Sequence, residues 1–154
     1  MAKLIFKKAA EGDCRDLWTW RNHPEVRKNS FDDAPISWKD HKKWFYSRFR
    51  DRSARIYIAR DRKEKVGVIR FDVEEFLIRV SVSLNPDFFG KKLGRELIRL
   101  GTEKIFTETK KRLSVIAEVK KDNIASQKAF LKAGYRHAGE TREKIVYKKE
   151  ADYV

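Results

Sequence analysis

The stretch from Val82 to Arg95 constrains the fold of this chain more than any other. It reads VSLNPDFFGKKLGR, which is typical of a strand, a glycine-bracketed basic loop and the start of a helix. A β-branched strand, Leu113 to Val119, follows the helix. Strands joined through a helix form a crossover unit, so we expect Leu113 to Val119 to lie parallel to Val80 to Leu84.

The loop within this stretch is suited to holding an anion. Gly90 and Gly94 allow tight turns, and a helix that opens near Leu93 points unpaired N–H groups and its positive dipole end at the loop. Cations crowd this helix start, where acidic side chains are normally favoured, and a phosphate would neutralise them. A solvated basic turn is the alternative. The cations are Lys91, Lys92 and Arg95.

The remaining elements alternate in a pattern that predicts an α/β (α+β) fold with a mixed sheet. Helices are predicted after caps at Asp13 and Ser37, from Leu93 to about Thr109 and from about Asn123 to Ala133, with a short helical turn from Pro24. Strands are predicted at Leu4 to Lys8, Ile56 to Arg60, Val66 to Val73, Phe76 to Leu84, Leu113 to Val119, Tyr135 to Ala138 and Lys144 to Lys148.

The chain has 154 residues, of which 39% are charged, 41% apolar and 12% aromatic. This length is typical of one domain with a sizeable core, so we expect residues 1–154 to form a single domain. The single cysteine, Cys14, indicates a reducing compartment, and the sequence shows neither a secretory leader nor an apolar run of membrane-spanning length. These features predict a cytoplasmic protein without a membrane partner.

The formal charge is +14, from 37 Lys and Arg against 23 Asp and Glu. Such a charge makes nucleic-acid binding an alternative function. However, the basic residues are interleaved with acids and form no tail or single stripe, which disfavours nucleic acid and suits small anionic ligands. The three histidines show no ligand spacing with Cys, His or carboxylates, so no metal site is expected.

The carboxyl ends of the two parallel strands are expected to form a ligand crevice. An antiparallel partner on one side and a parallel one on the other make the strands diverge there, and ligands favour such a point. Asn123 and Ser126 begin the next helix at the same end, adding a second helix N-terminus and two polar side chains. Alternatively, Asn123 is only a helix cap and Ser126 a surface residue.

Two runs of sequence carry a resemblance to a known family. SVSLNPDFFGKKLGRELI and, about thirty residues later, IAEVKKDNIASQKAFLKAGY resemble the two signature regions of the GNAT superfamily of acetyl-CoA-dependent N-acetyltransferases. The resemblance covers the whole chain in element order. It implies a three-layer fold, with a central mixed but mostly antiparallel sheet of about six to seven strands flanked by about four helices.

The resemblance also implies which residues bind the cofactor, acetyl-CoA. Loop amides would cradle its pyrophosphate, Leu84 would donate its N–H to the thioester carbonyl, and Asn123 and Ser126 would contact it from the opposite side. The loop departs from the family pattern of Arg or Gln, two residues, Gly, one residue, then Gly or Ala: Phe89 and Lys92 replace the first residue and the middle Gly. The loop residues with this role are Phe89, Gly90, Lys91, Lys92, Leu93, Gly94 and Arg95.

Acetyl transfer to an amine needs removal of a proton from an ammonium group and stabilisation of a tetrahedral oxyanion. The predicted base is Glu118, where the similar ribosomal-protein N-acetyltransferases carry a glutamate assigned as base; an ordinary solvent-facing strand glutamate is the alternative. Many relatives use a tyrosine as general acid where this chain has Phe130. A water or Tyr147 would then serve, or the coenzyme A thiolate would leave unassisted.

The amino-terminal half is expected to shape the acceptor pocket. LWTWRNHPEVRKNSFDDAPISWKDHKKWF and VIRFDV resemble the acetyltransferases that modify amino sugars on nucleotide carriers in pathways of the pseudaminic acid type. This implies a small-molecule amine that attacks directly in a ternary complex, with a protein amino terminus as the rival acceptor. A homodimer is compatible with the sequence. The residues expected near the acceptor are Arg21, Asn22, Phe31, Arg70 and Asp72; helix-end capping and a structural Arg–Asp pair are the alternatives for them.

Overall fold

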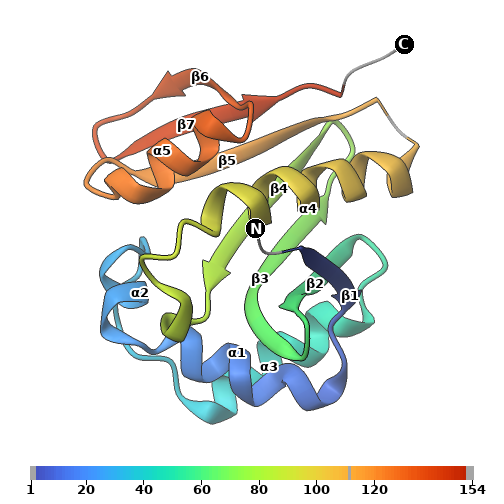
Figure 1. Cartoon of the computed structure of the whole chain (residues 1–154), viewed down its shortest axis with the longest axis vertical. Helices are drawn as coiled ribbons and strands as arrows, with labels where there is room; N and C mark the ends of the chain where they lie inside the picture. The colour runs from blue at the N-terminus through green and yellow to red at the C-terminus, as the bar shows by residue number, and fades with distance from the viewer. Residues whose placement is uncertain (1–2, 111, 152–154) are drawn as a thin grey trace.

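A seven-stranded sheet forms the middle layer of the protein (Figure 1). The structure, a computed structural model, describes residues 3–110 and 112–151. In this part of the chain the strands lie in the order β1-β2-β3-β4-β5-β7-β6. They are β1 (Leu4–Lys8), β2 (Ala54–Asp61), β3 (Glu64–Val73), β4 (Leu77–Leu84), β5 (Ser114–Lys120), β6 (Arg136–Glu140) and β7 (Lys144–Lys149).

Strands β4 and β5 pair in parallel, whereas all other described neighbours pair antiparallel. The parallel direction is as predicted, but the predicted partner segment was wrong. The pairs run from Leu77–Ser114 to Arg79–Ile116 and do not include Val80 to Leu84. The reason is that β4 stays in register with β3 as far as Leu84, while β5 follows β7, so β4 and β5 separate beyond Arg79.

Helices cover both faces of the sheet (Figure 1), and the described residues contain five α-helices and two short 3-10 helices, Glu11–Asp13 and Pro86–Phe88. The expected number was about four, and the extra one is the short α2, which the sequence predicted only as a turn. Its first residue is proline, and the ring nitrogen Nδ1 of His23 accepts the amide of Glu25. The helices are α1 (Cys14–Arg21), α2 (Pro24–Lys28), α3 (Trp38–Arg50), α4 (Gly94–Thr109) and α5 (Ile124–Lys132).

Two apolar clusters hold the three layers together, because successive strand residues point to opposite faces. In β2, Tyr57 packs in the cluster that includes helices α4 and α5, and Ile58 packs in the cluster that includes α1 and α3. Phe45 of α3 is fully buried in the second cluster and Trp38 and Trp44 pack against it, as predicted for core packing, whereas Phe49 of the same predicted stripe is 41% exposed. No helix in the described residues is long and apolar enough to cross a membrane.

Candidate active site

A cleft of about 410 Å³ opens where β4 and β5 separate. Its lining includes Val80 to Ser83 of β4 and Glu118 to Lys120 of β5. Consecutive side chains in a strand point to opposite faces, so a hollow lined by consecutive residues of both strands passes through the sheet. Figure 1 shows the consequence: β5, β7 and β6 group with α5, apart from β1 to β4. The cleft therefore opens toward α5 on one face and toward α1 and α3 on the other.

The open edge of β4 presents main-chain groups to the cleft. The amide of Asn85 donates to the carbonyl of Val66 at 2.8 Å, which makes this a hydrogen-bonded pair of the β3–β4 ladder. Hydrogen-bonded and non-hydrogen-bonded pairs alternate in antiparallel sheets, so the backbone groups of Leu84 and Val82 point away from β3. They therefore point toward the edge where pairing with β5 has ended, as the predicted role of the Leu84 N–H requires.

The loop between β4 and α4 lies outside the lining of the cleft, with none of residues 89–95 among the lining residues, and it contains two residues with positive φ. Gly90 has φ +77° and Lys92 has φ +58°, so the lysine occupies the left-handed region that glycine favours. The pattern's middle glycine is thus replaced without loss of its conformation. Among the described residues, the amides from Gly90 to Arg95 donate to no other protein group. Gly94 begins α4 beside α5, where a Cβ would lie 3.7 Å from that of Ala129.

Phe89, which replaces the Arg or Gln of the pattern, contacts the acceptor half of the chain. Its ring meets that of His23 edge-on, with 5.6 Å between the ring centroids. His23 lies just before α2, so a residue of the predicted cofactor loop packs against the junction of α1 and α2. The Lys91 ammonium lies 5.0 Å from the ring centre of Phe88.

Asn123 and Ser126 both line the cleft from the start of α5. Oδ1 of Asn123 accepts the amide of Ser126 at 3.2 Å, so Asn123 is a helix cap and a cleft residue at once. Phe130 also lines the cleft, and its ring stacks on Tyr147 with 6.1 Å between centroids. Tyr147 is buried and is not among the lining residues, which disfavours it as a proton donor.

Glu118 lies in the cleft between two cations. Its Oε1 is 3.0 Å from Nη1 of Arg79, and its Oε2 is 2.9 Å from Nζ of Lys144. The hydrogen bond from Lys144, together with the charges of Lys144 and Arg79, holds the pKa of Glu118 below its ordinary value. The carboxylate is therefore ionised and electrostatically partnered, which suits it to orient a cation or a water.

The structure places three of the five predicted acceptor residues in the cleft lining: Arg21, Phe31 and Arg70. Asn22 is not in the lining, and its side chain instead holds the loop after α2. Its Oδ1 accepts the amide of Ile36 and its Nδ2 donates to the carbonyl of Ile36, both at 2.8 Å. Arg21 donates through Nη2 to the carbonyl of Asp32 at 2.9 Å.

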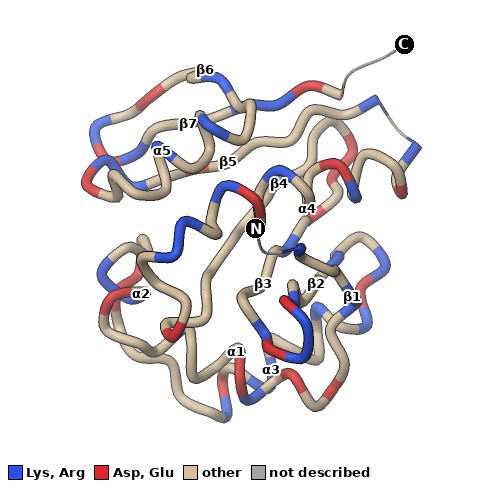
Figure 2. Tube along the Cα trace, in the orientation of Figure 1, with Lys and Arg blue, Asp and Glu red and all other residues tan. Residues whose placement is uncertain are grey.

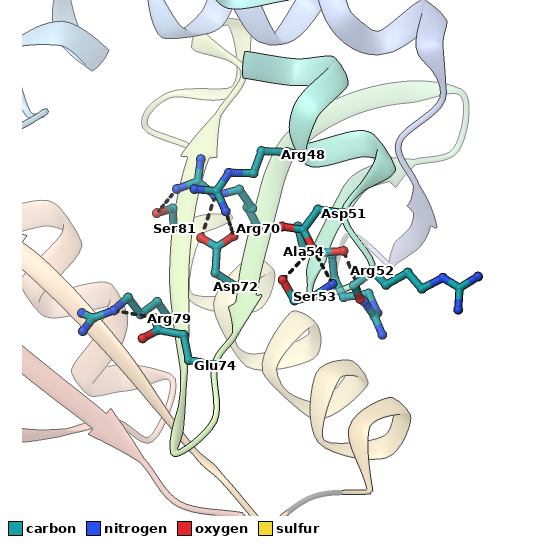
Figure 3. A network of polar contacts seen from close by, with 11 residues as sticks. Arg48, Asp51, Arg52, Ser53, Ala54, Arg70, Asp72, Glu74, Arg79 and Ser81 are labelled. Carbon is teal, nitrogen blue, oxygen red and sulfur yellow. Dashed lines mark hydrogen bonds and ion pairs between the residues drawn. The ribbon is translucent and has the colours of Figure 1, made fainter. Parts of the chain in front are cut away.

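Asp72 also lies outside the lining and joins a network on the α3 face of the sheet (Figure 3). Its Oδ1 is 2.8 Å from Nη1 of Arg48, and its Oδ2 is 3.3 Å from Nε of Arg70, at an angle that does not suit a hydrogen bond. Nη2 of Arg70 donates to Oγ of Ser81 at 3.2 Å. The Arg70–Asp72 pair therefore fixes Arg70 in position beside the cleft.

Sequence reasoning missed several lining residues. Trp44 was assigned to the core stripe of α3, yet it lines the cleft with its ring 5.1 Å from the guanidinium carbon of Arg70. Trp20 and Ser83 line the cleft too. Lys120 was missed although it lies two residues after Glu118, a spacing that places both side chains on the same face of β5. That spacing is the signal that would have found it.

No group of three or more His, Cys, Asp or Glu side chains able to hold a metal occurs in the described residues. His41, which lines the cleft, donates through Nε2 to the carbonyl of Cys14 at 2.8 Å, because a carbonyl can only accept. Burial lowers the pKa of His41, which favours its neutral form.

Three solved structures share the fold of this chain at low sequence identity. A domain from Methanocaldococcus jannaschii DSM 2661 is 21% identical, with a TM-score of 0.83 over 98% of this chain and 100% of that one. Spermidine N-acetyltransferase from Vibrio cholerae, in complex with CoA and spermine, is 17% identical, with a TM-score of 0.81 over 94% and 92%. AAC(6')-Ib in complex with ribostamycin and coenzyme A is 17% identical, with a TM-score of 0.84 over 96% and 93%.

No curated protein matches the chain in sequence. The family model described as "Acetyltransferase (GNAT) domain" matches residues 3–136, which is most of the chain. The match includes the glycine-bracketed loop, β5 and α5. The chain therefore belongs to the GNAT acetyltransferase family.

Proposed function

We propose that this protein transfers the acetyl group of acetyl-CoA to a primary amine by direct attack in a ternary complex. The observation that carries the proposal is the cleft that passes through the sheet beside the unpaired edge of β4. A cofactor entering from the α5 face and an amine entering from the α1–α3 face would meet at this gap. No covalent enzyme intermediate is needed, because the two reactants are held on opposite sides of one opening.

The cofactor side supplies main-chain donors. The free amides from Gly90 to Arg95 and the start of α4 suit a pyrophosphate, and the ammonium groups of Lys91 and Lys92 add charge. The outward-facing N–H of Leu84 suits the thioester carbonyl, where it would stabilise the oxyanion. Asn123 and Ser126 suit contacts with the pantetheine arm from α5. The solved V. cholerae and AAC(6')-Ib proteins bind coenzyme A, which supports the same cofactor here.

Glu118 is the proposed base, and its surroundings define how it would act. An ammonium group has a pKa near 10, so a carboxylate of low pKa cannot keep its proton, which must pass on through water to the bulk solvent. Glu118 would therefore attract the ammonium and relay its proton through a water at the gap. With Phe130 in the place of an acid, the thiolate would leave without a protein donor or with a water.

For the acceptor we propose an amino sugar on a nucleotide carrier, on the resemblance of the amino-terminal half. An amino terminus of a ribosomal or other protein is the second candidate, because the predicted position of Glu118 is shared with that branch. A basic module that binds nucleic acid ranks third. Figure 2 shows Lys and Arg along nearly every element and interleaved with Asp and Glu, which does not favour a single nucleic-acid groove.

One screen tests the proposal. Acetyl-CoA turnover is measured with nucleotide-linked 4-amino sugars and with peptides that carry free amino termini. Acetylation of a sugar nucleotide supports the first acceptor, and acetylation of peptides supports the second. Saturable binding of acetyl-CoA at moderate salt is expected in both cases. Failure to bind acetyl-CoA, or nucleic-acid binding that falls steeply with salt, would contradict the transferase proposal.

A further inference from the structure

The acceptor side of the cleft carries a positive charge. The charged residues in its lining are Arg21, Arg70, Lys120 and Glu118, which makes three cations against one carboxylate. His41 also lines it, but burial lowers its pKa and it adds no charge at neutral pH. An amine acceptor with several positive charges would meet repulsion in this cleft.

Two of these charges already have ion-pair partners in the protein. Glu118 forms ion pairs with Arg79 and Lys144, neither of which lines the cleft. Arg70 forms an ion pair with Asp72. In the described part of the chain, Arg21 and Lys120 form no ion pair with a carboxylate, unlike Arg70 and Glu118. They are therefore the two cations of the lining whose charge remains available to a ligand.

Arg21 and Lys120 hold the two ends of one short segment. Nζ of Lys120 donates to the carbonyl of Lys28 at 3.1 Å, and Nη2 of Arg21 donates to the carbonyl of Asp32 at 2.9 Å. The residues between these two carbonyls, 29–31, all line the cleft. The two cations therefore flank the same stretch of the cleft wall, although they come from β5 and α1.

Arg21 also has an unused donor. Its Nη1 is buried and has no hydrogen-bond partner, and leaving a buried charged donor unpaired costs free energy. Burial lowers the pKa of Arg21, whereas the nearby Asp32 raises it and Arg27 lowers it. The carboxylate Oδ1 of Asp32 is occupied by the amide of Ala34. An anion bound beside residues 29–31 would lie next to this guanidinium, whose Nη2 bonds the carbonyl at the end of the same segment.

We propose that the acceptor is an amine that also carries a phosphate or carboxylate, and that Arg21 and Lys120 bind this anionic group beside residues 29–31. The inference rests on the proposed transferase function and names the charge class of its substrate. An anionic acceptor would distinguish this chain from the solved neighbours, which are in complex with spermine or ribostamycin. Both of these ligands are polycations. In this cleft, charge selects against such amines.

Binding measurements at saturating coenzyme A test the proposal, because the cofactor then fills its own phosphate sites. Trp20 and Trp44 line the cleft, so intrinsic tryptophan fluorescence reports occupancy. The probes are glucosamine 6-phosphate, muramic acid, glucosamine and spermidine, which present a phosphate, a carboxylate, a single amine and a polycation. We expect saturable binding of an anionic probe at least about tenfold tighter than that of glucosamine, and none of spermidine.

Variants locate the anion site. Arg21→Gln and Lys120→Gln should each weaken the anionic probe about tenfold while coenzyme A affinity stays unchanged. Arg21→Lys keeps the charge and guards against a folding defect. Lys39→Gln, on the exposed side of α3, removes the same charge outside the cleft and should change nothing. Which of the two anionic probes binds identifies phosphate or carboxylate as the recognised group.

Three outcomes would overturn the anion site. These are tighter binding of spermidine than of either anionic probe, no saturable signal from either anionic probe, and loss of coenzyme A affinity in parallel with probe affinity. None of them would contradict the proposed function, which is judged separately by coenzyme A binding and acetyl-CoA turnover. Failure of those two measurements would contradict the transferase itself.

Discussion

The two sides of the cleft are built from different chemical groups. On the α5 side the proposed donors are main-chain amides of Leu84 and of the loop before α4, next to but outside the cleft lining, whereas the α1–α3 side lines the cleft with side chains from α1, β3, β5 and the segment after α2. Main-chain donors are available from any residue that adopts the right conformation, as Lys92 does in place of glycine. Side-chain donors change with each substitution. We infer that the α5 side keeps its ligand when side chains are substituted. Substitutions on the α1–α3 side can change which ligand it accepts.

The largest expected effect concerns the main-chain side. Leu84→Pro removes the outward N–H of β4 without removing a bond to β3, so the sheet should form while kcat/KM falls about a hundredfold to a thousandfold, as when an oxyanion donor is lost. Leu84→Ala keeps the N–H and should retain most activity. Ser83→Pro removes a ladder bond to Val68 and should instead lower the free energy of unfolding. Steady-state kinetics and denaturant unfolding separate the three. Equal kinetics for Leu84→Pro and Leu84→Ala would show that this N–H has no role.

The next largest effect concerns the contribution of the Glu118 side chain to the rate. Glu118→Gln should lower kcat by about a hundredfold without abolishing turnover, because positioning of the reactants supplies the larger share of the rate.

The pH–rate profile gives the control for Glu118. Lys144 lowers the pKa of Glu118, so Lys144→Gln should raise that pKa and move the acidic limb of kcat to higher pH. The limb rises as the carboxylate ionises, and removing its cationic partner delays that ionisation. An unchanged kcat across the pH profile of Glu118→Gln would rule out Glu118 as the base.

The smallest expected effect is on stability, at Lys92 in the loop before α4. Lys92→Gly should raise the free energy of unfolding by about 0.5–1 kcal/mol, because glycine adopts the left-handed conformation without strain. Lys92→Ala keeps the strained left-handed backbone conformation and, like Lys92→Gly, removes the ammonium charge. Coenzyme A affinity should fall equally in both variants if only the ammonium group contributes. A lower stability of the glycine variant in denaturant unfolding would contradict the strain argument.

The main-chain side was the more predictable from sequence. The alternation in β4 and the two glycines identify a strand, a loop and a helix start, and these local features fix where the amides lie. The parallel direction of β5 follows from the crossover alone. The extent of the pairing does not, because it depends on how β3 and β7 hold β4 and β5, and no local pattern encodes that.

The acceptor side depends on contacts between distant residues. Lys120 contacts Lys28, 92 positions away in the sequence, and no spacing rule predicts such a contact. Asn22 is polar and adjacent to Arg21, so it reads as a site residue, yet Ile36 occupies both polar atoms of its amide. Side-chain partners decide which polar residues stay available, and these partners are set only when the chain is folded.

The short parallel register between β4 and β5 also has a mechanical consequence. In the residues that the structure describes, three backbone pairs between β4 and β5 join the four-stranded half of the sheet to the half formed by β5, β7 and β6. The helices α4 and α5, which pack on each other, supply a further connection between the halves. A molecule lying along both open strand edges would add bonds across this junction. Amide hydrogen exchange in β5 should then slow when coenzyme A is present, which would make the bound cofactor part of the cohesion of the sheet.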